Sequence, residues 1–327
     1  MVTALVTGVT GQDGGYLAEQ LVDAGHEVHG ICRGEPARAR EIPHLAALGD
    51  RLTLHRADIR NLPSLIRVVD DLAPDWLFNL GGLSSVAASW TEPLITFDTN
   101  ARPVIGVLEY LRGRHRRGER PIRFIQASSG ESFAGADTGK PIDETCPVDP
   151  VNPYGAAKAV GHQLMGMYRT QGVFCSSLIL FNHESPRRPA RFVTRRITAG
   201  VAAIATGRAT QLTLGNLDVC RDWGWAPDYA RAMLLAAEAD EPDDYVVATG
   251  ESNNLTDLIA IAFARVGITD WASYVTSDQS LLRPADTAAL VGDSTRIRER
   301  LGWAPTVGFR EMVEAMVDAD LAELGAS

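Results

Sequence analysis

The sequence predicts an α/β protein, a doubly wound parallel sheet with a smaller C-terminal lobe, and three observations lead to this fold class. Through the first half of the chain, short apolar runs alternate with segments of helical length, which is the pattern of successive βαβ units. A glycine-rich turn follows the first apolar run directly. Beyond Phe181 the pattern changes to mixed loops, helices and short strands punctuated by prolines. A chain of 327 residues, of which 45% are apolar, is long enough for a large domain with a smaller partner.

Strands of the large domain are expected where apolar runs of strand length occur. They are residues 3–8, 27–32, 52–55, 76–80, 122–127 and 173–181. A helix is expected over residues 152–169, because Pro153 favours a helix start and apolar residues recur after it at helical spacing. We therefore expect residues 1–181 to form the large domain, with about 227–250 returning to it, and residues 182–327 to form mainly the lobe. The lobe should cover the carboxyl ends of the strands, where ligands bind in such sheets.

The composition argues against several classes of protein. The net charge of -10 disfavours nucleic acid as a partner, because phosphate binding depends on a positive surface. No run reaches the roughly 18 apolar residues that cross a bilayer, and the first residues lack the basic start of a signal peptide, so we expect a cytoplasmic protein that does not enter membranes. The four cysteines stand far apart and are expected to be reduced thiols, and the seven scattered histidines predict no metal site. Only His183 stands beside other polar candidates, and it either touches substrate or is a hydrogen-bonded structural histidine.

The turn after the first expected strand reads GVTGQDG and predicts a dinucleotide site. It places Gly8, Gly11 and Gly14 between a strand and a helix. Glycine permits a tight turn and a close approach of backbone to pyrophosphate, and the helix N-terminus supplies amide donors and a positive dipole. The large domain is therefore expected to be of the Rossmann type.

The end of the second expected strand indicates which dinucleotide is bound. An NAD-preferring fold has an acidic residue about 20 positions after the glycine turn, where it binds the ribose hydroxyls. Here Arg33 stands at that point and Glu35 follows it. An arginine suits a 2′-phosphate through charge-assisted hydrogen bonds, so NADP is the expected cofactor. Asp58 and Ile59, at the end of the third strand, are expected to border the cofactor, and Asp58 either reaches the adenine amino group or caps the next helix.

Two further segments carry catalytic side chains. NPYGAAKAV places Tyr154 and Lys158 four residues apart, on one face of the expected helix. A tyrosine has a pKa of about 10 in water, so a tyrosine base near pH 7 requires about 4 kcal/mol of stabilisation of the phenolate. The positive charges of the lysine and of an oxidised nicotinamide ring can provide it. Upstream, QASSGESFAG presents Ser129 and Glu131, and the carboxylate has no cationic neighbour in sequence.

These motifs together resemble the nucleotide-sugar branch of the extended short-chain dehydrogenase/reductase superfamily. Longer blocks, more specific than three glycines, narrow the resemblance to the GDP-mannose 4,6-dehydratase family over nearly the whole chain. They are Gln12 and Asp13 inside the glycine turn, FNHESPRR (181–188), FVTRRI (192–197), LGNLDVCRDWG (214–224) and RPADTAALVGD (283–293).

The resemblance implies roles for individual residues. Tyr154 is implied as the base with Lys158 as its helper, Ser129 as a hydroxyl that contacts the sugar, and Glu131 as the carboxylate that works at carbon 5. The implied cofactor residues are Gly8, Gly11, Gln12, Asp13, Gly14, Arg33, Asp58 and Ile59, together with Tyr154 and Lys158. The implied substrate-binding residues are Ser85, Asn182, Arg196, Arg221 and Arg283. The sequence departs from the family pattern at positions near the sugar, which leaves the exact sugar open: Ser85, Gly130, Ser132, Ala134 and Trp225.

The resemblance also implies a reaction, that of an NADP-dependent hydro-lyase that converts GDP-mannose to GDP-4-keto-6-deoxymannose. Tyr154 takes the proton of the 4-hydroxyl as hydride leaves carbon 4, Glu131 takes the hydrogen at carbon 5, water leaves carbon 6, and the hydride returns there. The alternatives are a reductase or epimerase of a related GDP-sugar, a dehydratase of a modified GDP-sugar (a heptose, or one that releases a 5,6-unsaturated product), and a non-enzymatic NADP-sensing protein. The family further implies a homodimer that pairs through two long helices, with a homotetramer as the larger alternative.

Overall fold

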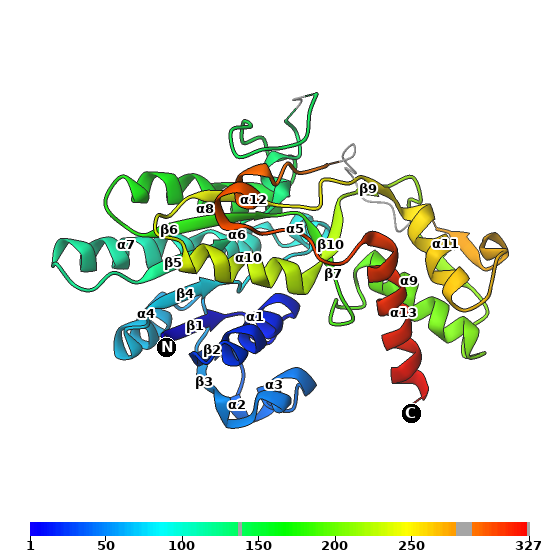
Figure 1. Ribbon diagram of the computed structural model, residues 1–327, viewed down its shortest axis with the longest axis horizontal. Coiled ribbons are helices and arrows are strands. Elements are labelled where there is room, and N and C mark those ends of the chain that lie inside the picture. The colour runs from blue at the N-terminus through cyan, green and yellow to red at the C-terminus, as the bar shows by residue number, and fades with distance from the viewer. Residues whose placement is uncertain (137–138, 279–289, 326–327) are drawn as a thin grey trace.

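A seven-stranded parallel sheet forms the centre of the protein, whose computed structural model describes residues 1–136, 139–278 and 290–325 (Figure 1). The strand order is β11-β6-β5-β4-β1-β2-β3. The chain therefore adds β2 and β3 on one side of β1 and then adds β4, β5, β6 and β11 on the other side. The predicted α/β fold class is confirmed. The strands are β1 (Thr3–Thr7), β2 (Glu27–Cys32), β3 (Leu52–Arg56), β4 (Trp76–Asn79), β5 (Arg123–Ala127), β6 (Cys175–Leu180) and β11 (Asp244–Val247).

Helices cover both faces of this sheet, because the side chains of a strand point alternately to opposite sides. In β1, for example, Ala4 and Val6 pack into one apolar core and Leu5 into the other. The first face is covered by α1 (Gln12–Asp23), α2 (Pro36–Ala39), α3 (Pro43–Leu48), α10 (Ala226–Glu238) and α12 (Thr295–Leu301). The second face is covered by α4 (Leu62–Leu72), α7 (Arg102–Arg116) and α8 (Pro153–Arg169), with α5 (Val86–Thr91) and α6 (Pro93–Asn100) against α8.

A separate apolar core lies in the later part of the chain, at one end of the molecule (Figure 1). Its helices are α9 (Val193–Ala205), α11 (Leu255–Arg265) and α13 (Phe309–Gly325). Its short strand pairs are β8 (Leu212–Leu214) with β13 (Val275–Ser277), and β9 (Cys220–Arg221) with β12 (Asn253–Asn254). A parallel pair, β7 (Asn182–Glu184) with β10 (Trp223–Trp225), connects this core to the large sheet.

Two segments of the later part return to the large sheet. The first is α10 with β11, and β11 pairs in parallel with β6 at the edge of the sheet. The second is α12, whose Ile297 packs into the same core as Trp303, and the Trp303 indole donates a hydrogen bond of 2.7 Å to the Asp228 carbonyl. The second return has no signal in the local sequence.

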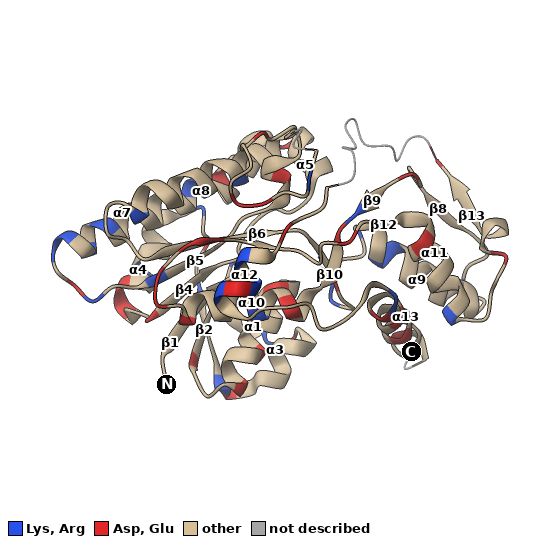
Figure 2. Cartoon of the chain, turned by 45° about the horizontal axis from the view of Figure 1, so that its top comes forward, with Lys and Arg blue, Asp and Glu red and all other residues tan. Residues whose placement is uncertain are grey.

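Charged residues of both signs alternate over the elements (Figure 2). The arginines at the end of α7 are matched by acids: Arg114 lies 3.1 Å from Glu119 and 3.9 Å from Asp70, and Arg112 lies 2.7 Å from Glu109. The positive charge of these arginines is therefore neutralised by neighbouring acids, which argues against a binding site for a polyanion at the end of α7. Every helix in the described part of the chain is too short or too polar to cross a membrane.

Candidate active site

A cavity of about 840 Å³ opens between the large sheet and the later lobe. The chain segments that follow β1, β2, β3, β4 and β5 contribute to it, as do α8, α9, β7 and β9. All the site residues predicted from the sequence line this cavity, with one exception. The exception is Arg283, which lies outside the described residues. Residues separated by nearly two hundred positions are thus brought to one place.

The glycine turn forms the floor of the cavity. Gly8 has a φ of +71°, and a Cβ there would lie 2.7 Å from the Gly81 nitrogen. At Gly14 a Cβ would lie 2.3 Å from the Gly8 oxygen. The Gly11 amide donates to that same oxygen at 2.9 Å and Gly11 precedes α1. The turn is therefore closed tightly enough to present the N-terminus of α1 to a ligand, as anion binding there requires.

Asp13, in the first turn of α1, forms a buried ion pair with His183 of β7. The carboxylate Oδ2 lies 3.0 Å from His183 Nε2, and His183 Nδ1 donates to the Phe181 carbonyl at 2.7 Å. Both ring nitrogens face acceptor oxygens, an arrangement that favours the protonated imidazolium of His183. Burial raises the pKa of Asp13, but His183 and Gln12 outweigh it and hold this pKa at about 2. Burial opposes the charge of His183 as well, yet Asp13 raises the histidine pKa above its usual value.

The same pair connects the glycine turn to the lobe. The Gln12 amide donates to Asp13 at 3.0 Å and to the His183 carbonyl at 3.2 Å, and accepts from the Ser185 hydroxyl at 2.8 Å. His183 also stacks on Tyr229, with ring centroids 4.4 Å apart. His183 is a hydrogen-bonded structural histidine that also lines the cavity, and contact with substrate stays a prediction.

At the other end of the cavity, Arg33 and Asp58 lie at the carboxyl ends of β2 and β3. Arg33 is exposed, and its charge helps, after that of Arg60, to lower the pKa of Asp58. Arg60 binds Asp58 through both carboxylate oxygens, at 2.7 Å from Oδ2 and 3.1 Å from Oδ1. Asp58 does not cap α4; that role belongs to Asn61, whose side chain accepts from the backbone of the first turn. Glu35, the other acid near this edge, forms an ion pair with Arg56.

Tyr154 and Lys158 lie on the face of α8 that meets the cavity. Lys158 Nζ donates to the Ala127 carbonyl at 2.9 Å and lies 5.9 Å from the centroid of the Tyr154 ring. Burial lowers the pKa of Lys158 to about 8, against the opposing charge of Asp13. Burial raises the pKa of Tyr154 to about 12, although the Ser129 hydroxyl acts to lower it. The protein alone therefore keeps the phenol protonated at neutral pH.

A chain of buried hydrogen bonds crosses the sheet beneath Lys158. The Thr7 hydroxyl donates to Asn79 Oδ1 at 2.7 Å, Asn79 Nδ2 donates to Gln126 Oε1 at 2.7 Å, and Gln126 Nε2 donates to the Ala127 carbonyl at 2.7 Å. Each side chain is no more than 4% exposed. Because the donors all run in one direction, both amides have a fixed orientation. The chain ends on the carbonyl that Lys158 also uses.

Ser129 and Glu131 follow β5 and begin a short 3-10 helix, η2 (Gly130–Phe133). The Ser129 hydroxyl accepts from the Glu131 amide at 3.2 Å. The Glu131 carboxylate accepts from Asn152 Nδ2 at 2.8 Å, across the cavity wall from the start of α8. Among the described residues, the partner of the Glu131 carboxylate is therefore a neutral amide and not a cation.

The substrate-side candidates come from the lobe and from α5. Arg196 lines the cavity, whereas its neighbour Arg195 turns away to Asp320, because successive helix residues point about 100° apart. Arg221 is only 8% exposed, and its guanidinium donates to the Cys220 carbonyl at 2.7 Å. The others are Asn182, the first residue of β7, and Ser85, whose hydroxyl caps α5 by accepting from the Ala88 amide.

The sequence reading missed Asn152 and the amides of Asn79 and Gln126. Asn152 stands directly before Pro153 at the expected helix start, which is a signal for a helix cap but carries no information about its second partner. The two buried amides lie 47 positions apart, and nothing local to either one predicts their contact.

Known proteins of one family resemble this chain over most of its length. The sequence profile of the family described as "GDP-mannose 4,6 dehydratase" matches residues 5–316. The chain is 42% identical over 325 residues to "GDP-mannose 4,6 dehydratase 2" of Arabidopsis thaliana, covering 97% of this chain and 86% of that protein. It is 38% identical over 342 residues to "GDP-mannose 4,6 dehydratase" of Homo sapiens, covering 97% and 91%. A solved UDP-glucose 4-epimerase of Thermotoga maritima shares the fold, with a TM-score of 0.83 at 23% identity over 98% of this chain and 99% of that one.

Proposed function

The chain belongs to the GDP-mannose 4,6-dehydratase family, and we propose that it converts GDP-mannose to GDP-4-keto-6-deoxymannose as an NADP-dependent hydro-lyase. The observation that carries the proposal is the meeting of a Tyr154–Lys158 pair and the Glu131 carboxylate in one cavity. Oxidation at carbon 4 needs only the pair. A separate carboxylate is what elimination across carbons 5 and 6 needs in addition.

The residues of the cavity fit a nicotinamide dinucleotide. The glycine turn and the N-terminus of α1 suit the pyrophosphate, and the imidazolium of His183 offsets the Asp13 carboxylate that would otherwise repel it. When bound, the oxidised nicotinamide accepts hydride from carbon 4 of the sugar and returns it to carbon 6. NADP is favoured over NAD because Arg33 is exposed and lines the cavity, where it can meet a 2′-phosphate, whereas Glu35 is paired with Arg56 and is not among the lining residues.

Tyr154 is the proposed base for the first step. Its phenol, buried and protonated in the protein alone, needs nearby positive charge before it can take the proton of the 4-hydroxyl. Lys158 supplies part of that charge from the same helix, and its position is held by the Ala127 carbonyl. Ser129 lies beside the Tyr154 hydroxyl and is the proposed contact to the sugar oxygen at carbon 4.

Glu131 is the proposed base for the second step. A ketone at carbon 4 acidifies the hydrogen at carbon 5, and Glu131 takes this hydrogen as the 6-hydroxyl leaves as water. The diphosphate is held at a distance from this chemistry by Arg196 and Arg221, whose planar guanidinium groups match phosphate oxygens in pairs. Arg283 is proposed for the same task from its place in the sequence alone.

A mass and absorbance time course tests this function. Purified protein is incubated with GDP-mannose and a catalytic amount of NADP, without reductant. We expect each sugar nucleotide to lose one water with no net change in the absorbance of reduced cofactor. Consumption of one cofactor per sugar would instead indicate a reductase, and unchanged GDP-mannose would refute the proposal and turn attention to a modified GDP-sugar.

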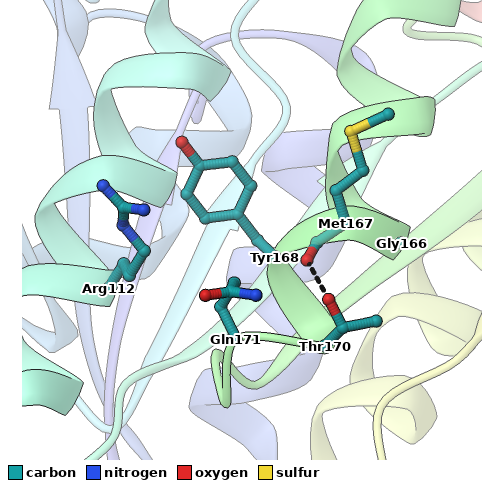
Figure 3. A pocket seen from close by; sticks show the side chains of 6 residues that line it. All are labelled: Arg112, Gly166, Met167, Tyr168, Thr170 and Gln171. Atoms are coloured by element: carbon teal, nitrogen blue, oxygen red, sulfur yellow. Dashed lines mark hydrogen bonds between the residues drawn. The ribbon is translucent and has the colours of Figure 1, made fainter.

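We also propose that the protein is a homodimer, paired through α6, α7 and α8. Apart from Met1, the large apolar side chains that stand exposed among the described residues all lie on α5 to α8: Trp90, Leu94, Ile95, Phe97, Ile105 and Met167. Leu94 is 80% exposed and Met167 61%, which is unusual for a surface that faces only water. Figure 3 shows an open hollow on the same face, formed by α7 and the end of α8 and lined by Arg112, Gly166, Met167, Tyr168, Thr170 and Gln171.

A further inference from the structure

The carboxamide of Asn152 joins the start of α8 to the carboxylate of Glu131. Asn152 Oδ1 accepts from the Gly155 amide at 2.8 Å, which caps the helix. Asn152 Nδ2 donates to Glu131 Oε2, also at 2.8 Å. Asn152 is only 6% exposed, so water competes little for either bond. Because the cap occupies the amide oxygen, the amide nitrogen must face Glu131, and the orientation of the side chain is fixed.

The backbone of Glu131 is held against the same turn of helix. A Cβ at Gly155 would lie 2.3 Å from the Glu131 carbonyl oxygen, so α8 approaches Glu131 as closely as a residue without a side chain permits. On the other side, the Glu131 amide donates to the Ser129 hydroxyl at 3.2 Å. Among the described residues, the remaining carboxylate oxygen, Oε1, receives no hydrogen bond. Fixing Oε2 therefore leaves Oε1 as the oxygen that can accept a proton.

We propose that Asn152 is a positioning residue for Glu131, which holds Oε2 and so presents Oε1 to the hydrogen at carbon 5. The inference rests on the proposed function, in which Glu131 is the base of the elimination step. It adds a physical link between the two bases of the reaction. Asn152 belongs to the first turn of the helix that carries Tyr154, so the oxidation base and the elimination base are held in one fixed arrangement.

Capping alone does not account for an asparagine at this place. A serine or an aspartate caps a helix about as well, since the cap needs only a side-chain oxygen. What the carboxamide adds is the N–H donor, and Glu131 receives it. The donor that Glu131 receives from Asn152 is neutral. The charged and titratable side chains that line the cavity together with Glu131 include Asp13, Tyr154, Lys158, His183, Glu184, Arg188, Arg196 and Arg221.

Two substitutions separate the donor from the cap. Asn152→Ser keeps an oxygen for the Gly155 amide but has no group that reaches Glu131. Asn152→Asp also keeps the cap, and it places a second carboxylate where the donor was, so that the two acids must share a proton. Both variants should retain the melting temperature of the parent to within about 2 °C, because the cap is preserved.

The readout is the ratio of two half-reactions. Exchange of the carbon 5 hydrogen with heavy water reports on Glu131, and reduced cofactor in a single turnover reports on Tyr154. For Asn152→Ser we expect carbon 5 exchange to fall about tenfold while oxidation stays within about threefold. For Asn152→Asp we expect exchange to fall at least as far as in Asn152→Ser and to recover at higher pH than in the parent, because the two neighbouring carboxyls share a proton.

Asn61→Asp is the matched control. Asn61 caps α4 in the same way, by accepting from the Ser64 amide at 3.2 Å, but it is exposed and outside the cavity. This variant should leave the pH profile of carbon 5 exchange where it is. If Asn152→Ser and Asn152→Asp also leave both the ratio and the pH profile unchanged, Asn152 is only a cap and the inference is wrong.

A measurement without substrate distinguishes failure of the inference from failure of the proposed function. In protein labelled with ¹³C-glutamate, the Glu131 carboxyl signal is identified by its loss in Glu131→Gln. We expect this signal to titrate at higher pH in Asn152→Asp than in the parent. Equal titration contradicts the inference, whatever the enzyme does. A parent protein that leaves GDP-mannose unchanged, or a Glu131→Gln variant that exchanges carbon 5 normally, contradicts the proposed function instead.

Discussion

Replacing Lys158 by methionine should abolish oxidation at carbon 4 and, at the same time, make the cofactor-free protein more stable at pH 7. Burial lowers the pKa of Lys158 from 10.5 to about 8. At about 1.4 kcal/mol per pH unit, keeping this lysine charged costs the folded state about 3 kcal/mol. Methionine fills a similar volume without charge. It loses the hydrogen bond to the Ala127 carbonyl, a net loss of about 1 kcal/mol, but that carbonyl keeps the donor of Gln126 at 2.7 Å. A gain of about 2 kcal/mol remains.

The difference in stability between Lys158→Met and the parent depends on pH. Below pH 8 the lysine is charged in both the folded and the unfolded chain, so the folded state bears the whole cost. Between pH 8 and 10.5 the folded lysine is neutral while the unfolded one still binds a proton, so the stability of the parent rises with pH relative to the variant. The advantage of Lys158→Met in urea unfolding should therefore be largest at pH 7, should vanish near about pH 9.5 and should become a deficit of about 1 kcal/mol by pH 10.5, where only the lost hydrogen bond remains.

A direct titration supports the interpretation of the stability data. The chain has only one other lysine, Lys140, which is exposed and whose pKa is raised by its hydrogen bond to Asp143. In protein labelled with ¹³C-lysine, one of the two ε-carbon signals should titrate near pH 8 and should be absent from Lys158→Met, and the other should titrate above pH 10. A variant that is less stable than the parent at pH 7, or equally more stable at every pH, would refute the reasoning.

Three further predictions concern cofactor, base and assembly. Glu131→Gln should still accumulate reduced cofactor with GDP-mannose while carbon 5 exchange into heavy water falls on the order of a hundredfold or more, and normal exchange would remove Glu131 from the mechanism. Arg33→Ala should weaken NADP by roughly 1.5 to 3 kcal/mol in a fluorescence titration and NAD much less, since only NADP carries the phosphate, and equal losses would contradict the assignment. Met167→Glu should convert the dimer to a monomer in light scattering without lowering the melting temperature of the subunit, and a parent that is already monomeric would refute the proposed pairing.

Much of the large domain could be predicted from sequence because buried parallel strands are continuous apolar runs. The last expected strand, 173–181, differs from β6 by two residues at one end and one at the other. The return of α12 to the large sheet could not be predicted. Its seven residues have only Ile297 fully buried, so the local pattern does not show which of the two apolar cores receives the helix.

The candidate site could be predicted where a motif is local and not where a contact is long-range. Tyr154 and Lys158 are one helical turn apart, so the sequence places them on one face. The ion pair of Asp13 with His183 joins residues 170 positions apart, and the sequence offered only a hint, that His183 stands among other polar residues. Asp58 could be read as a cap or as a cofactor contact, and only the structure shows that Asn61 takes the cap.

Lysine and arginine occupy different positions in the site because the proposed reaction requires different properties of the cation at each. Of 31 basic residues only two are lysines, and one of them is Lys158. Arginine stays charged in any protein environment, which suits Arg196 and Arg221, because a diphosphate is held best by a permanent charge with paired donors. It would serve poorly beside Tyr154, where the cation must be compact enough to be buried against the Ala127 carbonyl. Burial lowers the pKa of the lysine, and keeping it charged costs the folded state about 3 kcal/mol. The positive charge that is kept at this cost favours the tyrosinate form of Tyr154. Lys158→Arg should therefore be as inactive as Lys158→Met although it preserves the charge, and an active arginine variant would show that charge alone, without the compact ammonium, is what Tyr154 requires.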